Sequence, residues 1–426
     1  MRDMVTLSRE ELHTSVVDPV SASMNFLNEV ASRFPSAISL AAGRPFDEFH
    51  SVGDIDKHIQ AYLTHLRERG LGPAQSRSLL TQYGRTNGHV GDLIARMLDV
   101  DENIQVPAAA VMVTTGCQEA MVIALRGLCA GPDDVVLAAE PCYVGLTGAA
   151  RILGVEVVGV PESEDGLRPE TVRAVAAATR SRGKRPRALY LVPNFANPSG
   201  VSLPVTTRRA LLAAAADEDL LILEDDPYGL FGLDDEPRPT LKSLDADQRV
   251  IYLGSFAKSY FPGARVGYLV ADQPVVDAAG RHTLLAEELS TVKSMLTVNT
   301  SALSQAVVGG MLIDSGFSLR TANQAKIAFY RHNLATLLSA LQRYFAGTPV
   351  HWNSPSGGFF VVVDVPVDAS EELLEVSASE HGVLWTPMRF FYINGGGERA
   401  IRLSCSAIEP ERIDEGVRRL AGLLLR

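Results

Sequence analysis

The sequence predicts an α/β protein with a mostly parallel sheet, and two patterns along the chain support this class. Between about residues 107 and 268, short β-branched runs alternate with Ala- and Leu-rich stretches of helical length. Strands that alternate with helices in this way form a mostly parallel sheet with helices on both faces. After residue 300 the pattern changes to long helical periodicity followed by hairpin-like strands, which indicates a second, smaller α+β domain.

Seven short apolar runs are the strand candidates of the large domain. Their β-branched content and their spacing are typical of buried strands. They cover residues 111–115, 135–139, 155–160, 188–192, 220–224, 250–252 and 266–270. We therefore expect a seven-stranded sheet, and we expect ligands at the carboxyl ends of its strands.

Helical stretches separate these strands, at residues 118–128, 145–153, 169–180 and 207–217. A longer helical pattern covers residues 319–345, and strands follow at 357–363 and 400–404. The 426 residues exceed what a single hydrophobic core usually organises. We expect an N-terminal arm (1–19), a small domain (20–47 with 318–426) and a large domain (48–317).

Composition excludes several functional classes. A formal net charge of -11 argues against a surface that binds nucleic acid, because such a surface needs concentrated Lys and Arg residues. The four cysteines form no Cys-x-x-Cys pair and have no zinc-site spacing, so we expect free thiols and no metal. The polar N-terminus is unlike a signal peptide, and no run of about eighteen apolar residues predicts a membrane span. These features favour a cytoplasmic protein.

Lys258 is the most informative candidate for catalysis. It lies in the segment Gly-Ser-Phe-Ala-Lys-Ser (254–259), and Arg265 follows seven positions later. A lysine that forms an imine must lose its proton near neutral pH, which burial beside cations promotes. Ser255 and Arg265 supply a hydroxyl and a guanidinium, which together suit a phosphate. An aldehyde joined to a phosphate describes pyridoxal 5′-phosphate, whereas an isolated Ser-x-x-Lys is more often a solvated turn.

Two further segments follow predicted strands near the start of the sheet. Gly116, Cys117 and Gln118 lie where a strand passes through a glycine into a helix, and exposed N–H groups at such a point can hold a phosphate. A glycine at that junction also has a purely structural explanation. Tyr143 follows the next strand, where its ring either stacks on a cofactor or fills the core.

Two polar segments follow the next strands. Asn197 begins Asn-Pro-Ser-Gly, which is a good β-turn in itself, and its amide can also donate to a phenolate oxygen. Asp225 lies in Glu-Asp-Asp-Pro-Tyr, which is either an exposed acidic turn or a site where a carboxylate keeps a pyridine nitrogen protonated. Tyr228 can hydrogen-bond the oxygen of the same ring.

Arg402 stands inside an apolar strand of the predicted small domain. A buried guanidinium needs a partner, and a carboxylate bound through two hydrogen bonds is the natural one. A structural ion pair is the competing explanation. An arginine from the second domain is well placed to hold a substrate that lies on the first.

These segments, taken in order, resemble the fold-type-I pyridoxal phosphate enzymes. Within them the chain resembles the class I/II aminotransferases of the α-aminoadipate and kynurenine branch, from about residue 20 to the C-terminus. The family's Asn-Pro-x-Gly is matched by residues 197–200, its Asp-x-x-Tyr by 225–228, and its Ser-x-x-Lys with a following arginine by 255, 258 and 265. The resemblance implies an aspartate-aminotransferase-like fold with pyridoxal 5′-phosphate as cofactor.

The resemblance also implies roles for other residues. It places Gly43 and Arg44, in a segment similar to the family's Gly-Gly-x-Pro, beside the substrate pocket. Tyr83 looks like the tyrosine that reaches the phosphate of the neighbouring subunit, which implies a homodimer with shared active sites. Two departures stand out: Ala257 replaces a second phosphate-binding hydroxyl, and Cys117 replaces the usual Ser or Ala.

The implied reaction moves an amino group from an α-amino acid to a 2-oxo acid by ping-pong kinetics, with Lys258 as Schiff-base partner and as the group that moves the Cα proton. The alternatives are oxidation, elimination or decarboxylation of an amino acid on the same scaffold. A ligand-sensing domain of a transcription regulator is a third hypothesis. It requires a DNA-binding domain before residue 20, for which we expect the chain to be too short and too acidic.

The substrate is the least defined feature. Arg44 either pairs with a distal carboxylate, which would favour aminoadipate or glutamate, or faces solvent. The aromatic segment 385–392 favours a pocket wall for a bulky side chain. The sequence is also similar to aminotransferases of peptide-antibiotic pathways that make aryl-glycines such as hydroxyphenylglycine or 3,5-dihydroxyphenylglycine.

Overall fold

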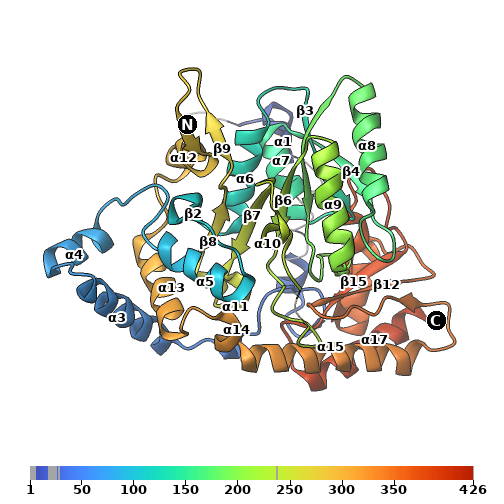
Figure 1. The fold of residues 1–426 in the computed structure, drawn as a ribbon. Helices are drawn as coiled ribbons and strands as arrows, with labels where there is room; N and C mark the ends of the chain where they lie inside the picture. Colours follow the sequence, from blue (N-terminus) through green and yellow to red (C-terminus); the bar gives the residue numbers. More distant parts are fainter. Residues whose placement is uncertain (1–5, 18–25, 27–28, 237, 426) are drawn as a thin grey trace, which may run out of the picture.

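A seven-stranded sheet forms the centre of the computed structural model, which describes residues 6–17, 26, 29–236 and 238–425 (Figure 1). Strand β8 is antiparallel to both of its neighbours, β2 and β7, and the other neighbouring pairs are parallel. In spatial order the strands are β2 (Val111–Thr114), β8 (Gly267–Val270), β7 (Val250–Ser255), β6 (Leu221–Asp225), β5 (Arg185–Leu191), β3 (Asp134–Glu140) and β4 (Glu156–Pro161). The predicted α/β class and the seven strands are confirmed, with small shifts at their ends.

The strands bury both of their faces because successive side chains point in opposite directions. Val136, Ala188 and Leu223 belong to the core on one face of the sheet. Leu137, Leu189 and Ile222 belong to the core on the other face. The first face packs on α6 (Cys117–Leu128), α7 (Val144–Leu153) and α12 (Leu285–Leu296), and the second on α8 (Pro169–Ser181), α9 (Val205–Asp217) and α10 (Leu241–Leu244).

A third core covers the β2 and β8 end of the sheet, where Val111, Val113 and Val270 pack against helices. Figure 1 shows α3 and α4 at this edge of the molecule, far from α8 and α9. The helices here are α3 (Val52–Glu68), α4 (Pro73–Thr81), α5 (Gly91–Glu102), α11 (Phe256–Ser259) and α13 (Ala302–Asp314). Among them, α3 and α13 pack along each other.

A four-stranded antiparallel sheet organises the C-terminal part of the chain, in the order β11-β12-β15-β14. Its core includes Val361, Leu403 and Trp385. The helix α15 leads into it from the large sheet, along the lower edge of Figure 1. The elements are α14 (Leu319–Ala322), α15 (Gln324–Phe345), β11 (His351–Trp352), β12 (Phe360–Asp364), α16 (Glu371–Val376), β14 (Thr386–Pro387), β15 (Ala400–Ser404) and α17 (Pro410–Leu424).

The segment before α3 joins the C-terminal part. Strand β1 (Ile38–Ser39) pairs in parallel with β13 (Val383–Leu384), and Ile38 and Leu40 belong to the same core as Leu403. The remaining described elements are α1 (Thr14–Val17), β9 (Pro274–Val276), β10 (His282–Leu284) and the short helical turns η1 (Arg9–Glu11), η2 (Asp47–Phe49), η3 (Ala108–Ala110), η4 (Pro262–Ala264), η5 (Ser377–His381) and η6 (Met388–Phe391).

These cores support the predicted division into domains, which we propose in the same form. Residues 30–41 and much of 334–424 share one core, whereas the large sheet and its helices form the others, which Ile327, Tyr330, Phe359 and Phe360 of the predicted small domain also join. Parts of the predicted arm and of the start of the small domain, at 1–5, 18–25 and 27–28, lie outside the described residues. Within the described part of the chain, no helix is long and apolar enough to cross a bilayer.

Candidate active site

The pairing of Gly267 explains how the predicted site residues come together. This residue pairs with Thr114 of β2 on one side and with Ser255 of β7 on the other. The antiparallel strand β8 therefore brings its starting end, with Arg265, to the edge where its neighbours end. A Cβ atom on Gly267 would lie 2.7 Å from the Cys117 nitrogen, so only glycine permits this approach.

A cavity of about 460 Å³ opens at this edge. Residues from β-strand ends and from the C-terminal part line it together. Among them are the predicted site residues Gly43, Arg44, Cys117, Gln118, Tyr143, Asn197, Asp225, Tyr228, Ser255, Lys258, Arg265 and Arg402. Positions spread over most of the sequence thus meet in one concave space.

Lys258 projects into this cavity from the short helix α11. Its Nζ donates a hydrogen bond to the Gly43 carbonyl oxygen at 2.7 Å. Burial lowers the pKa of Lys258 to about 8, and the positive charges of Arg402 and Arg265 act in the same direction. The amine is therefore available in its neutral, nucleophilic form near physiological pH.

Asp225 ends β6 and is almost fully buried, at 3% exposure. Its Oδ2 accepts a hydrogen bond from the Tyr190 hydroxyl at 2.8 Å, and its Oδ1 accepts one from the Cys117 thiol at 3.5 Å. Burial raises the pKa of Asp225 to about 6, although both hydrogen bonds and the charge of Lys258 act against this. The carboxylate is ionised at neutral pH but lacks a cationic hydrogen-bond partner among the described residues.

Arg265 lines the cavity, whereas the predicted site residue Gly116 lies against the Arg265 guanidinium and is not itself among the lining residues. Gly116 is the N-cap of α6 and has a φ of 75°, and a Cβ atom there would lie 2.5 Å from Nη2 of Arg265. The guanidinium therefore lies against the start of a helix whose first N–H groups have no partner within the helix. Ser255 also lines the cavity, and its Oγ accepts a hydrogen bond from the Ala257 nitrogen at 3.1 Å, which leaves its hydrogen free to donate.

Arg402 lies opposite, held by β15. It is 6% exposed, and its guanidinium donates to Asn197 Oδ1 and to the Ala41 carbonyl oxygen at 2.9 Å. Its Nε has no hydrogen-bond partner among the described residues. Burial lowers the pKa of Arg402 to about 10, so the side chain stays cationic. The bond to Oδ1 also orients the Asn197 amide, whose NH₂ group remains available as a donor.

Tyr143 and Tyr228 complete the walls. Tyr143 is the N-cap of α7, and a Cβ atom on Gly145 would lie 2.2 Å from its ring, so the ring lies over this glycine. Gln118 donates to the Gly145 carbonyl oxygen at 2.7 Å. Burial raises the pKa of Tyr143 to about 12 and raises that of Tyr228 as well, so both hydroxyls stay protonated and can donate.

The structure also gives the positions of three further features that the sequence singled out. Arg44 lies at the cavity but is largely exposed and forms an ion pair with Asp47. Tyr83 is 86% exposed and does not line the cavity of its own chain. The expectation that the 385–392 segment forms a pocket wall is correct only for Phe391, because Trp385 is buried in the small-domain core and bonds Ser377.

Sequence reasoning missed several contacts in this site. Tyr190 binds Asp225, and the carbonyl groups of Ala41 and Gly43 accept from Arg402 and Lys258. A tyrosine inside a fully buried strand needs a partner for its hydroxyl, and this was the signal available for Tyr190. The carbonyl contacts have no sequence signal because any residue carries a carbonyl group.

Comparison with known proteins decides the family. The family model of aminotransferase class I and II matches residues 37–420. The chain is a class I and II aminotransferase. It is 50% identical to an (S)-3,5-dihydroxyphenylglycine transaminase of Amycolatopsis orientalis, over 98% of this chain and 94% of that protein.

Two further relatives of this aminotransferase are more distant. A 2-aminoadipate transaminase of Thermus thermophilus is 32% identical, over 92% of this chain and 90% of that protein. The solved structure of Pyrococcus horikoshii kynurenine aminotransferase superposes with a TM-score of 0.81 at 27% identity, over 98% of this chain and 96% of that one. The aminotransferase therefore has the fold-type-I architecture that its sequence predicts.

The cofactor of this aminotransferase is pyridoxal 5′-phosphate, and the cavity fits it. A lysine that loses its proton near neutral pH suits its aldehyde. The glycine at position 116, the free helix N–H groups and Arg265 suit its phosphate. The buried Asp225, which lacks a cationic partner among the described residues, suits a protonated pyridine nitrogen.

Proposed function

We propose that this aminotransferase forms or consumes an aryl-glycine of the hydroxyphenylglycine or 3,5-dihydroxyphenylglycine type. The observation that carries the proposal is the 50% identity to a 3,5-dihydroxyphenylglycine transaminase over nearly the whole chain. The more distant relatives named above act on other amino acids, at 32% identity or less.

The cavity wall supports an aromatic substrate. Phe391, Met121 and Val144 line the cavity with apolar surface. An aryl-glycine carries its ring directly on Cα, so the ring must lie within one bond of the reacting atom. Such a ring delocalises the charge left when Cα loses its proton, which makes this substrate class intrinsically easier to deprotonate.

We assign the cofactor-holding roles from the geometry. Gly116, Cys117 and Gln118 at the helix start, together with Ser255 and Arg265, would hold the phosphate. Tyr143 would cover one face of the ring, and Asn197 and Tyr228 would donate to its oxygen. When bound, the cofactor supplies an aldehyde for the amine and a ring that accepts electrons.

Lys258 is the residue we assign to proton transfer. Its pKa of about 8 lets one side chain both release and accept a proton near neutral pH. Its present partner is a carbonyl oxygen, which holds Nζ in the cavity without supplying a counter-charge. Asp225, ionised above its pKa of about 6, supplies the negative charge that the ring nitrogen requires.

Arg402 is the residue we assign to the substrate carboxylate. Its guanidinium stays cationic, and β15 and Asn197 hold it in place. Its Nε is without a partner among the described residues, so the site offers an unused donor. Arg44, which is already paired with Asp47 at the rim, is a less suitable anchor for a distal carboxylate.

A half-reaction with each amino acid tests the substrate proposal. The holoenzyme is mixed with 3,5-dihydroxyphenylglycine, phenylalanine or 2-aminoadipate, and cofactor absorbance reports amino transfer. We expect the aryl-glycine to react at least about tenfold faster than phenylalanine, which has an extra methylene next to Cα and lacks the two ring hydroxyls. A preference for 2-aminoadipate would refute the proposal while leaving the aminotransferase activity intact.

We also propose a homodimer in which Tyr83 reaches the partner's phosphate. Tyr83, Val52 and Met295 are more than four-fifths exposed on the single chain. Exposed aromatic and apolar side chains of this size favour a protein contact. All four cysteines are free thiols, which supports a cytoplasmic enzyme. We further propose that its aryl-glycine serves peptide-antibiotic synthesis.

A further inference from the structure

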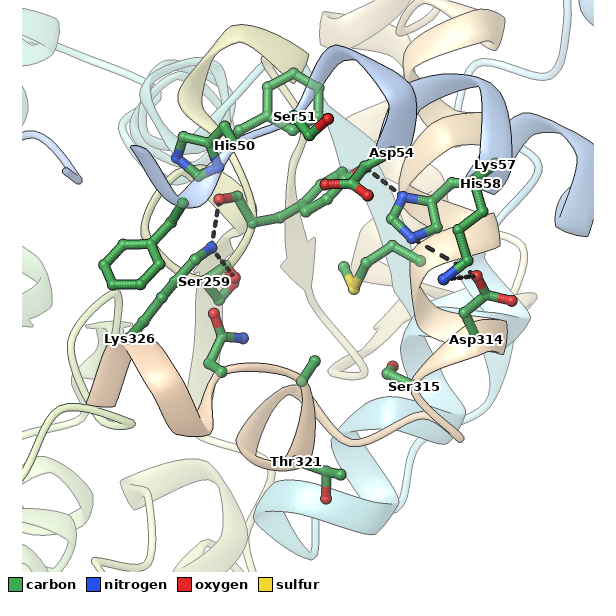
Figure 2. Close-up of a pocket in the computed structure, with 16 residues that line it drawn as sticks. His50, Ser51, Asp54, Lys57, His58, Ser259, Asp314, Ser315, Thr321 and Lys326 are labelled. Carbon is green, nitrogen blue, oxygen red and sulfur yellow. Dashed lines mark hydrogen bonds and ion pairs between the residues drawn. The ribbon is translucent and has the colours of Figure 1, made fainter. Parts of the chain in front are cut away.

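A second cavity, of about 390 Å³, adjoins the helix that carries Lys258 (Figure 2). Ala257 and Lys258 line the active-site cavity, whereas Ser259 and Tyr260 line this second one. Its other walls come from the start of α3, the end of α13 and the junction of α14 with α15. The cavity therefore contacts both the catalytic helix and the helix that leads into the small domain.

Lys326 of α15 joins these two elements. Its side chain is buried, and Nζ donates to the Ser259 carbonyl oxygen at 3.2 Å and to the Tyr260 carbonyl oxygen at 2.9 Å. Figure 2 shows this lysine beside Ser259 at one side of the cavity, with Asp314 on the opposite side. An ammonium group carries three donors, so one remains for a ligand.

Two buried side chains of the cavity each carry one polar atom that lacks a hydrogen-bond partner among the described residues. Among the described residues, neither Ser259 Oγ nor Asn323 Oδ1 has a hydrogen-bond partner, although the residues are only 6% and 1% exposed. Asn323 Nδ2 donates to the Leu319 carbonyl oxygen at 2.8 Å, which identifies Oδ1 as the free acceptor. Buried polar atoms of this kind normally have partners, so each indicates a group that the cavity is built to receive.

The charges that face the cavity are of both signs. Lys57 lies 3.0 Å and His58 3.7 Å from Asp314, so these groups already have partners. The Asp54 carboxylate accepts no hydrogen bond from the side chains and backbone that the structure describes, and its charge acts on Lys326. Burial lowers the pKa of both His50 and His58, which keeps them neutral at pH 7. Asp54 and Lys326 are thus the charges available to a ligand.

We propose that this cavity is a second binding site for a zwitterionic α-amino acid. A carboxylate would accept from Lys326 and from Ser259 Oγ, and an ammonium group would donate to Asp54 and to Asn323 Oδ1. A ligand with only one of these charges leaves half of the polar atoms unmatched. The volume is within the range of roughly 300–1,000 Å³ that small-molecule sites occupy, and Phe49 and Phe261 offer surface for a side chain.

Occupation of this site acts on the catalytic helix. The ligand engages Ser259, the residue directly after Lys258, and Lys326, which holds the carbonyl groups that end α11. It also engages Asn323 at the start of α15. Amino acid binding therefore links the position of the Lys258 helix to that of the helix leading into the small domain, with no contact to the active-site cavity.

The test is amino acid binding to holoenzyme in which borohydride has fixed the cofactor to Lys258, so that no reaction proceeds. Titration calorimetry with L-glutamate and with L-phenylalanine gives the number of sites for each chain. We expect a site that survives Arg402→Met, and Asp54→Asn should weaken this site at least about tenfold because it removes a charged hydrogen bond. Acetate and methylamine, each with one of the two charges, should not fill the site.

Asp56→Asn is the matched control, because Asp56 lies exposed on the same helix and does not line the cavity. Ser259→Ala is a second variant, which removes the unpartnered hydroxyl and leaves the backbone bonds to Lys326 in place. Loss of all binding in Arg402→Met would overturn the proposal, as would equal affinities in Asp54→Asn and Asp56→Asn. Thermal unfolding shows that each variant is folded.

Discussion

The thiol of Cys117 donates a hydrogen bond to Oδ1 of Asp225, with 3.5 Å between sulfur and oxygen. The first residue of α6 thereby contacts the carboxylate that ends β6. The contact lowers the pKa of Asp225, against the larger effect of burial. Burial and the nearby Asp225 charge raise the pKa of the thiol well above its usual value, so it stays protonated and remains a donor.

Replacement of Cys117 tests this contact. Cys117→Ala removes one hydrogen bond to the ionised carboxylate, so we expect the pKa of Asp225 to rise by about one unit. The cofactor needs the ionised form of Asp225. The pH at which cofactor binding begins to weaken on acidification should therefore rise by the same amount. Cys117→Ser keeps a donor and should behave like the unchanged enzyme. The measurement is the cofactor dissociation constant between pH 5 and pH 8, and identical Ala and Ser profiles would contradict the role.

The raised pKa of Asp225 also predicts a stability effect in the apoenzyme. The folded carboxyl has a pKa of about 6 against an ordinary value of 3.8, so the folded form binds its proton more tightly. The contribution of this carboxyl group to the free energy of unfolding is therefore fully present below about pH 4 and is lost as the pH rises through about 6. Asp225→Asn should stabilise the apoenzyme by about 2–3 kcal/mol at pH 8 and by almost nothing at pH 4.

Urea unfolding of the apoenzyme at these two pH values measures that difference. The same variant should bind the cofactor less tightly, because its amide carries no charge for the ring nitrogen. Asp56→Asn, on an exposed surface, controls for a general effect of charge removal. A stabilisation of equal size at both pH values would show that ionisation of Asp225 is not its cause.

Arg402→Lys separates geometry from charge at the proposed carboxylate anchor. Lysine keeps the positive charge but cannot bond Asn197, the Ala41 carbonyl and a substrate through one planar group. We expect KM for the amino acid to rise by roughly 30- to 100-fold, with cofactor absorbance unchanged. Arg44→Lys, at the exposed rim, should change KM for an aryl-glycine less than about threefold. If the two variants raise KM equally, Arg402 is not the anchor.

Mixed dimers test the proposed role of Tyr83. Chains with Lys258→Ala and chains with Tyr83→Ala are unfolded, mixed and refolded together. If Tyr83 completes the partner's site, each mixed dimer holds one intact site out of two. Because random pairing makes about half of the dimers mixed, about a quarter of the activity of the unchanged enzyme should return. Each variant refolded alone measures the background. Activity that stays at the average of the two backgrounds would place Tyr83 outside the partner's site.

The sequence alone predicted the positions of the strands more completely than the contacts within the cavity. Valine-rich runs such as 111–115 alternate with helices, and this pattern is local, so the seven strands were predicted closely. Polar groups after strand ends were expected to meet because parallel strands end at one edge of a sheet. Lys258, Asp225 and Asn197 do line one cavity, and their roles remain predictions that the variants test.

Other contacts in the structure could not be predicted, because no short sequence pattern indicates them. Trp385 was expected near the pocket because it is aromatic, but the β14–β15 pairing turns its segment so that Trp385 enters the small-domain core and only Phe391 reaches the cavity. The partner of Tyr190 depends on the register between β5 and β6, where Leu191 pairs with Glu224. Such registers involve residues far apart in the chain.

The sequence by itself determined which chemical groups the protein carries and which edge of the sheet holds them, because strand periodicity and strand-end residues are local properties. Only the tertiary structure decided how those groups act on one another. The pairing of Gly267 with both Thr114 and Ser255 brings Arg265 to Gly116, and the fold buries Lys258 and Asp225. Burial and long-range contact set the pKa values that make a lysine and a carboxylate useful, and neither is a property of a short segment.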